Sequence, residues 1–428
     1  MTDDGAFSVP SFSCRHCGHP VTQPFVDLGV TPLCQTQILP GQFSAPERHF
    51  PLQACVCTHC WLVQLRDCIG SADVFTEDYP YFSSYSSSWV QHARTYVDRM
   101  VERLGLNAGS LVIELASNDG YLLQHFKPHG VPVLGVEPSR SVAEAAIAAG
   151  IRTEIRFFGR EAARDLRSRY GAADLIVGNN VLAHVPDIND FVGGVQAALK
   201  PQGSVTFEFP HLLNLMRMNQ FDTIYHEHFS YLSLHAVLAV FRTAQLEVYD
   251  VEQLSTHGGS LRVFGQHVGA GRSPSPAVQA LLDEERQAGL LDAGTYAAFA
   301  EQAKATKRAI LSFLIEARAH GKHIAGYGAP GKGNTLLNYC GVGTDFIDFT
   351  VDANPAKQHT FTPGSRIPIY PPDHIREARP DYLFILPWNL KEEIMAQTAY
   401  IQEWGGQWVT PIPRPEVWSA PVGRPAPT

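Results

Sequence analysis

Apolar runs and amphipathic stretches alternate along the middle of the chain. The runs are apolar on both faces, which predicts buried parallel strands, and the stretches between them have helical spacing. This alternation predicts a doubly wound parallel sheet. The last two predicted strands are joined by a short connection, 257–260, which predicts an antiparallel strand at the sheet edge. The predicted strands are 111–116, 132–136, 151–155, 174–178, 204–209, 246–252 and 260–267.

The flanking segments have different patterns. A second alternation of strands and helices starts near residue 323 and predicts a Rossmann-like domain. The stretch before it is rich in Ala, Glu and Arg and reads as a helical bridge, whereas the beginning of the chain is rich in Pro and Cys. We therefore expect four parts: a small cysteine-rich module (1–70), the doubly wound domain (71–270), the helical bridge (271–320) and the Rossmann-like domain (321–428).

The composition narrows the class of protein. Of the 428 residues, 45% are hydrophobic and 18% charged, which excludes a mainly disordered chain. The net charge of −9 argues against nucleic-acid binding. The chain has no long apolar run that would span a membrane, and its first residues lack the pattern of a secretory signal. We expect a cytoplasmic protein, a monomer or small homo-oligomer, with neither membrane nor nucleic acid as partner.

Seven of the eight cysteines lie at or before position 68. Two Cys-x-x-Cys pairs in this cluster predict a tetrahedral zinc site, which is structural because four protein ligands leave no position open for substrate. Cys55 competes with Cys57 as a ligand, and a group of buried reduced thiols is the alternative to a metal site. The predicted zinc ligands are Cys14, Cys17, Cys57 and Cys60.

Small and polar residues follow the first predicted strand, at 114–120. Such residues at a strand-to-helix turn let backbone amides approach a ligand. The middle glycines of G-x-G-x-x-G are missing, which favours a cofactor without phosphates such as S-adenosylmethionine. Glu137 ends the second strand, where a carboxylate can bind both ribose hydroxyls, although ordinary turns without a ligand remain the alternative. The predicted cofactor-binding residues are Glu114, Ala116, Ser117, Asn118, Gly120, Glu137, Asn179 and Asn180.

Histidines and a carboxylate gather in loops that open at the same edge of the predicted sheet. His184 follows the fourth strand, the sequence Tyr-His-Glu-His (225–228) follows the fifth, and His257 lies in the final hairpin. Histidine with a carboxylate partner offers a base that works near neutral pH. A His-x-His metal pair and a polar lid remain alternatives.

The sequence GYGAPGKGN at 326–334 matches G-x-G-x-x-G and follows an apolar strand. Asp352 ends the next strand, close to where a ribose-binding acid would fall. The pattern favours a dinucleotide site, but the loop suits any diphosphate, for which Lys332 adds charge. A tight turn required by packing is the alternative.

Over essentially its whole length, the chain resembles the bacterial deoxysugar C-methyltransferases, both in its motifs and in their order. The motifs are the four cysteines, ELASNDG (114–120), NNVLAHVPD (179–187), YHEHFSYLS (225–233), HGGSLR (257–262) and GYGAPGKGN (326–334). The resemblance implies a class I methyltransferase domain that binds S-adenosylmethionine, a structural Zn²⁺ in the N-terminal module, and a C-terminal domain that helps to hold a nucleotide diphosphate.

The resemblance also implies an activity: C-methylation, with C3 as the expected position, of a nucleotide-linked 4-keto deoxyhexose in branched antibiotic sugar biosynthesis. A base would remove a proton beside the keto group, and the enolate would take the methyl group. We expect His228 to be the base and Glu227 to orient the histidines. Tyr225, His184 and Tyr79 would hold the sugar and the enolate oxygen. The expected substrate-binding residues are His257, Ser260, Gly328, Ala329, Gly331, Lys332, Asn334 and Asp352.

Three other functions stay open from the sequence. An NAD(P)-dependent sugar-nucleotide oxidoreductase would use the C-terminal glycine loop and leave the middle domain idle. A noncatalytic sugar-nucleotide-binding protein would bind without turnover. An O-methyltransferase would differ only in the atom that receives the methyl group.

Overall fold

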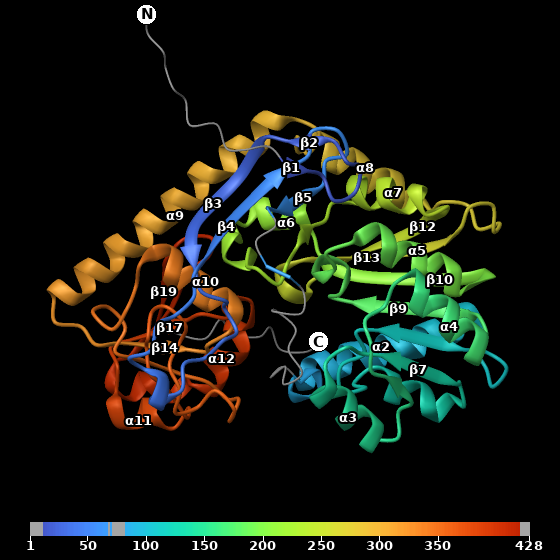
Figure 1. Cartoon of the computed structure of the whole chain (residues 1–428). Coiled ribbons are helices and arrows are strands. Elements are labelled where there is room, and N and C mark those ends of the chain that lie inside the picture. Colours follow the sequence, from blue (N-terminus) through green and yellow to red (C-terminus); the bar gives the residue numbers. More distant parts are fainter. Residues whose placement is uncertain (1–11, 67–68, 71–81, 420–428) are drawn as a thin grey trace, which may run out of the picture.

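The computed structural model describes residues 12–66, 69–70 and 82–419, and their strands form four sheets (Figure 1). The first is the two-stranded pair β1 (Phe12–Ser13) and β2 (Pro20–Val21). The others have four, seven and six strands. Within these described ranges, no helix is both long enough and apolar enough to cross a membrane.

The seven-stranded sheet forms the middle of the molecule and has the order β12-β13-β10-β9-β6-β7-β8. The five strands from β8 to β10 run parallel, as the sequence predicted for a doubly wound domain. The strand bounds are β6 Val112–Leu115, β7 Val133–Val136, β8 Thr153–Glu154, β9 Ala173–Asn179, β10 Leu199–Pro210, β12 Leu246–Leu254 and β13 Ser260–His267.

The antiparallel strand lies in a different place from the one we expected. It is β13, and it lies one position inside the edge, between β10 and the edge strand β12. The helix α7 (Leu234–Thr243) leads from the β10 side to β12, and the short hairpin then returns β13 into the gap. There β13 pairs with strands on both sides, so its backbone groups are satisfied more fully than at an edge.

The two faces of this sheet build separate cores. Ile113 and Ile176 point into one core, and their neighbours Val112 and Leu175 into the other, as expected for alternating side chains in a strand. The first core includes α4 (Arg160–Tyr170), α5 (Ile188–Ala198) and α7, and the second includes α2 (Ser87–Leu104). The helix α3 (Arg140–Ala148) adds Ala146 to the second core.

The N-terminal module contributes a four-stranded sheet of order β11-β5-β4-β3. Its bounds are β3 Gln23–Thr31, β4 Phe50–Val56, β5 Val63–Leu65 and β11 Ser230–Tyr231. The strand β11 belongs to the middle domain and follows the Tyr-His-Glu-His loop directly, and Ser230 pairs with Gln64 of β5. The sheet of the cysteine-rich module therefore anchors this loop.

Two helices lead from the middle domain to the C-terminal one. The shorter is α8 (Pro276–Gln287), and the longer, α9 (Ala293–Ala319), runs along β3 at the border of the molecule (Figure 1). Phe25 of β3 stacks on Phe299 of α9, with ring centroids 4.5 Å apart. This contact ties the N-terminal module to the helical bridge.

The C-terminal domain is a six-stranded sheet of order β16-β15-β14-β17-β18-β19, parallel except for the last pair. One core cluster joins this domain to the N-terminal module and the bridge, because it contains Leu52, Leu314 and Leu337 together. The bounds are β14 Ile324–Tyr327, α10 Gly331–Cys340, β15 Phe349–Val351, β16 Ile369–Tyr370, α11 His374–Ala378, β17 Tyr382–Ile385, α12 Lys391–Gln397, β18 Gln407–Thr410 and β19 Glu416–Trp418.

Candidate active site

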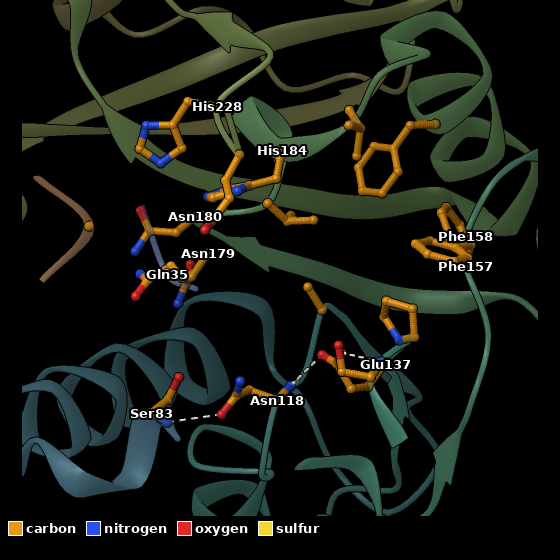
Figure 2. A pocket seen from close by; sticks show the side chains of 18 of the residues that line it. Gln35, Ser83, Asn118, Glu137, Phe157, Phe158, Asn179, Asn180, His184 and His228 are labelled. Carbon is orange, nitrogen blue, oxygen red and sulfur yellow. Dashed lines mark hydrogen bonds between the residues drawn. The ribbon is translucent and has the colours of Figure 1, made fainter. Parts of the chain in front are cut away.

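A cavity of about 480 Å³ opens where the carboxyl ends of the middle strands face the C-terminal domain. Three parts of the chain line it. The middle domain supplies the ends of β6, β7, β9 and β10, the N-terminal module supplies Gln35, and the C-terminal domain supplies Pro330–Lys332. Figure 2 shows Asn118 and Glu137 at one side of this cavity and His184 and His228 across from them.

The turn after β6 forms the first side of the cavity together with Glu137. The carboxylate of Glu137 accepts hydrogen bonds from the backbone N–H of Asn118 at 3.0 Å and of Ser139 at 2.8 Å (Figure 2). Ala116 and Asn118 adopt left-handed backbone angles, φ 55° and 50°, which bend the turn sharply. The Asn118 side chain accepts a further bond from the N–H of Ser83. These contacts hold the carboxylate at the cavity wall.

The other predicted cofactor residues on this turn lie behind the wall. Ser117 is fully buried, and a side chain at position 135 would come within 2.5 Å of its hydroxyl, so Gly135 is needed there. Glu114 is buried within the sheet, and this burial raises its pKa well above the ordinary value. Gly120 closes the turn at φ 79°. Of the predicted cofactor set, the cavity is lined by Ala116, Asn118, Glu137, Asn179 and Asn180.

S-adenosylmethionine fits this side of the cavity. Glu137 keeps acceptor capacity on a carboxylate that two backbone donors already orient, which suits a pair of ribose hydroxyls. Phe157 beside it is 53% exposed and lines the cavity, so an apolar face is open to a flat ring. No glycine-lined pocket for a pyrophosphate exists in this turn, and this cofactor needs none.

His228 lies on the opposite side of the cavity and is oriented by the backbone. Its Nδ1 lies 2.8 Å from the carbonyl oxygen of Thr223, which can only accept, so Nδ1 carries the proton and Nε2 keeps a lone pair in the neutral ring. Figure 2 shows this second nitrogen directed toward the cavity. Burial, with a smaller effect of His184, lowers the pKa of His228 well below 6.5. The ring is therefore neutral at pH 7.

His184 and His257 line the same cavity as His228. The rings of His184 and His228 meet edge to face, with centroids 4.5 Å apart. His257 accepts a hydrogen bond from the Asn180 side chain at 3.3 Å and has a left-handed backbone angle, φ 54°. Burial lowers the pKa values of His184 and His257 to about 4 each. The cavity therefore gathers three neutral imidazoles.

Tyr225 and Glu227 also reach the cavity. The Tyr225 ring lies 4.0 Å from the ring of His228, measured between centroids. The carboxylate of Glu227 accepts a weak hydrogen bond from the thiol of Cys34 at 3.8 Å, so it faces the N-terminal module. Tyr79, which the resemblance placed beside these residues, lies outside the described residues.

On the C-terminal side, Lys332 is the charged group that reaches the cavity together with Gly331. Its Nζ donates to the side chain of Asn389 at 2.8 Å and lies 4.7 Å from the ring centre of Trp388. Burial lowers the pKa of Lys332, and the carboxylate of Asp222 opposes that effect. A buried cation at this position can attract an anionic ligand.

The other predicted substrate-binding residues in and near the C-terminal glycine loop, Gly328, Ala329, Asn334 and Asp352, do not line the cavity. Asp352 accepts hydrogen bonds from the N–H groups of Ala329 and Asn354, both at 2.8 Å, so its carboxylate closes the loop. Asn334 donates to the carbonyl of Cys34 at 2.7 Å and ties α10 to the N-terminal module. Gly328 has φ 85°, where a side chain would meet Pro387. Ser260 bonds the carbonyl of Thr256 and is also absent from the cavity lining.

Several residues in or next to the cavity wall were not predicted from the sequence. Gln35 comes from the N-terminal module, about which the motif order said nothing, and Phe157 follows the edge strand β8. Trp388 lies against Lys332 and Asp222 acts on the charge of Lys332, but both lie in segments without a recognisable motif. An acid three residues before the Tyr-His-Glu-His loop was the available signal for Asp222.

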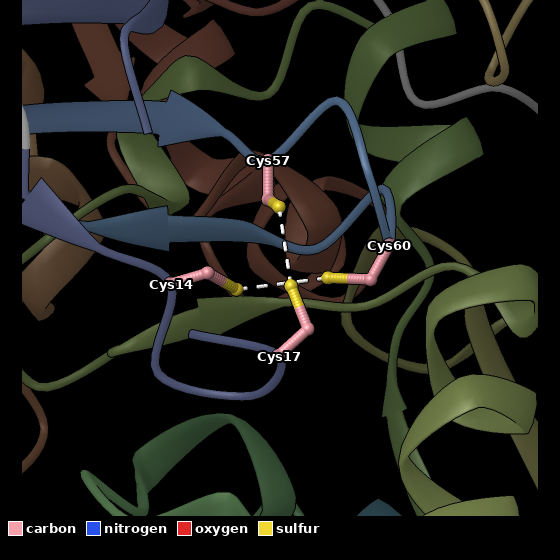
Figure 3. Close-up of side chains that lie close together, drawn as sticks. All are labelled: Cys14, Cys17, Cys57 and Cys60. Carbon is pink, nitrogen blue, oxygen red and sulfur yellow. Dashed lines mark hydrogen bonds between the residues drawn. The ribbon is translucent and has the colours of Figure 1, made fainter. Parts of the chain in front are cut away.

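The four predicted cysteine ligands form one cluster in the N-terminal module (Figure 3). Their sulfurs all lie within 4.8 Å of one another, with Cys14 and Cys60 at 3.6 Å and Cys17 and Cys57 at 3.5 Å. Zn–S bonds of about 2.3 Å separate the sulfurs of a tetrahedral site by about 3.8 Å. The cluster therefore fits zinc, and Cys57 rather than Cys55 is the member of the second pair.

Comparisons with known proteins agree with this organisation. Family models match a zinc binding domain at residues 14–75, a methyltransferase domain at 89–251 and a C-methyltransferase C-terminal domain at 255–413. The chain is 40% identical to the C-methyltransferase NovU of Streptomyces niveus over 411 residues, which are 96% of this chain and 98% of that protein.

Two further matches each cover less than half of the chain. One is 29% identity over 109 residues, 25% of this chain and 42% of the other, to the ubiquinone biosynthesis O-methyltransferase of Rhodopseudomonas palustris (strain BisA53). The other is the solved structure of magnesium protoporphyrin IX methyltransferase (ChlM) from Synechocystis PCC 6803 with bound SAH. It aligns with a TM-score of 0.34 and 15% identity over 41% of this chain and 82% of that chain.

The doubly wound sheet and the cofactor turn define a class I methyltransferase that depends on S-adenosylmethionine. The chain belongs to the C-methyltransferase family that includes NovU. Its four-cysteine cluster is a zinc site. The enzyme class is therefore that of a methyltransferase and not of an NAD(P)-dependent oxidoreductase or a noncatalytic binding protein.

Proposed function

We propose that this enzyme methylates a carbon beside the keto group, C3, of a nucleotide-linked 4-keto deoxyhexose, in the biosynthesis of a branched deoxysugar. The observation that carries the proposal is the orientation of His228. Its Nδ1 proton is held by the Thr223 carbonyl, and Nε2 presents a lone pair to a cavity that also reaches the cofactor turn. This is the arrangement that a general base for a C–H proton requires.

The chemistry follows from the acidity of the substrate. A keto group at C4 acidifies the C3–H bond, and Nε2 of His228 takes that proton while the bonding electrons move onto the keto oxygen. His184 and Tyr225, with Tyr79, are proposed to hold the sugar and that oxygen, and Glu227 to orient the histidine loop. S-adenosylmethionine supplies an electrophilic methyl group. The protein therefore has to position the sugar and the methyl donor and to supply one proton acceptor.

The remaining residues are proposed to bind the two ligands. Glu137 would accept from the ribose hydroxyls of the cofactor, and Gly331 and Lys332 at the start of α10 would hold the nucleotide diphosphate. Gly328, Ala329, Asn334 and Asp352 would shape that loop. In this proposal 1–70 is the zinc module, 71–270 the methyltransferase domain, 271–320 the bridge and 321–428 the sugar-nucleotide domain.

The test is an assay with S-adenosylmethionine and a nucleotide-linked 4-keto-6-deoxyhexose. The expected product carries one new methyl group bonded to carbon, which NMR identifies by its coupling to the ring. A second expected result is exchange of the C3 proton with deuterium from heavy water when the methyl donor is left out. A methyl group on oxygen, or no exchange and no product with any 4-keto sugar nucleotide, would contradict the proposal.

A further inference from the structure

One side chain of the C-terminal domain enters the methyltransferase domain beside the active site. Trp388 begins the 3₁₀ helix η7 (Trp388–Leu390), and its indole Nε1 donates to the carboxylate of Asp222 at 2.7 Å. The exposed fractions are 9% for Trp388 and 0% for Asp222. A buried bond between a donor and a carboxylate is costly to leave unmade, so this contact fixes the two elements relative to each other.

Asp222 belongs to the short element that orients the base. It lies in the 3₁₀ helix η5 (Phe221–Thr223), directly before Thr223, whose carbonyl accepts the Nδ1 proton of His228. A shift of η5 therefore moves the acceptor that sets the direction of the His228 ring. The side chain of Asp222 connects this element to a different domain.

Trp388 also borders the second loop that carries a cavity histidine. A side chain at position 258 would come within 2.7 Å of the Trp388 ring, so the hairpin backbone passes close to the indole at Gly258. The carbonyl of Gly258 accepts from the side chain of Gln220 at 2.7 Å. The neighbouring residue is His257, which lines the cavity. One indole therefore contacts both η5 and the hairpin that carries His257.

The Trp388 ring also lies against Lys332, the cation that reaches the cavity. Lys332 lies with its Nζ 4.7 Å from the Trp388 ring centre, and Asn389, the next residue, accepts from that Nζ. Asp222 is the negative charge that acts on Lys332 in this buried region. Cation, indole and carboxylate thus form one continuous group from the C-terminal loop to η5.

We infer that Asp222 and Trp388 are positioning residues that couple the Lys332 loop of the C-terminal domain to the orientation of His228. The inference rests on the proposed role of His228 as the base. A diphosphate that contacts Lys332 acts on the cluster of Lys332, Trp388 and Asp222, which holds η5. Binding of the nucleotide and alignment of the base are therefore linked. The C-terminal domain then contributes to proton removal as well as to binding.

The experiment measures deuterium exchange at the substrate C–H without the methyl donor, across substrate concentrations, in the full-length enzyme. Trp388→Phe removes the indole N–H and keeps an aromatic ring beside Gly258 and under Lys332. We expect the exchange rate at saturating substrate to fall about tenfold or more, since small displacements of a reacting group are costly. Asp222→Asn should lower the same rate. The double variant should exchange no more slowly than the slower of the two single variants, because both changes break one contact.

Trp408→Phe is the matched control. Trp408 is fully buried in the same domain and donates its indole N–H to Thr398 at 2.8 Å, away from the cavity. This change should lower the melting temperature at least as much and leave the saturated exchange rate unchanged. If Trp388→Phe alters only the substrate concentration needed for half-maximal exchange, or if the effects of the single variants add, the coupling is wrong. If His228→Gln enzyme exchanges the substrate proton as fast as the wild type, the proposed base itself is wrong.

Discussion

The imidazole rings of His184 and His228 meet edge to face at 4.5 Å, although they come from loops after different strands. Two imidazoles at this distance oppose each other's protonation, and the effect of His184 adds to burial in lowering the pKa of His228. The pair therefore presents neutral rings to the cavity at physiological pH.

Replacing the proposed base should abolish proton removal and leave ligand binding intact. We expect His228→Gln to lower both deuterium exchange and methyl transfer by about 10²–10⁴-fold, because a general base typically contributes that much. Calorimetry should show unchanged binding of S-adenosylmethionine. His226→Gln is the control, since His226 lies in the same loop but bonds the carbonyl of Pro51 and does not line the cavity. Normal exchange in the His228 variant would place the base elsewhere.

The rate of proton removal should remain level as the pH falls through 6.5, the ordinary histidine value. Burial lowers the folded-state pKa of His228, so the ring stays neutral and able to accept a proton below that pH. Protonation of His228 removes the base only when the pH falls through this lowered pKa. The measurement is the pH profile of kcat/KM for deuterium exchange, with circular dichroism to verify folding. An acid limb at or above pH 6.5 in folded enzyme would contradict this assignment.

Removing one cysteine ligand should release the zinc. We expect Cys57→Ser protein to lose most of its metal by elemental analysis, to melt at a lower temperature and to lose activity, because β5 of this module pairs with β11 beside the His228 loop. Cys55→Ser is the matched control. Cys55 lies two positions away, is buried in β4 and is not a member of the four-cysteine cluster. Equal zinc loss in both variants would contradict the ligand set.

Glu137→Ala should weaken S-adenosylmethionine binding by about 2–3 kcal/mol, the value expected when hydrogen bonds to a charged acceptor are lost. Titration calorimetry gives this number directly. Glu144→Ala serves as control because Glu144 lies on the neighbouring helix α3, with its side chain 62% exposed. Unchanged affinity in the Glu137 variant would show that the ribose is held by other groups.

Lys332→Met should weaken binding of the nucleotide sugar at least tenfold and leave S-adenosylmethionine binding unchanged, since a charge-assisted bond to the diphosphate is removed. Methionine keeps an apolar stem over Trp388. The control is Lys391→Met, because Lys391 also lies over an indole, that of Trp418, but does not line the cavity. The reverse pattern, weaker cofactor binding and an unchanged nucleotide sugar, would overturn the assignment of this loop.

Much of the fold was predictable because its signals are local. Continuous apolar runs marked the parallel strands, and the short connection at 257–260 required an antiparallel pair. The two Cys-x-x-Cys pairs identified the zinc ligands, since each pair forms one tight turn. Whether β12 or β13 forms the sheet edge was not predictable, because that depends on which backbone groups find partners across the sheet.

The candidate site was also predictable from the sequence only in part. The sequence determined which loops carry the chemistry: the cofactor turn, Glu137, and the histidines at 184 and 228. The tertiary structure decided that Asp352 bonds its own loop instead of facing the cavity, and that Gln35 comes to the site from the N-terminal module. It also decided that Trp388 meets Asp222. Gln35 and Trp388 meet residues that are distant from them along the chain, and only the packing of three parts around one cavity brings these residues together.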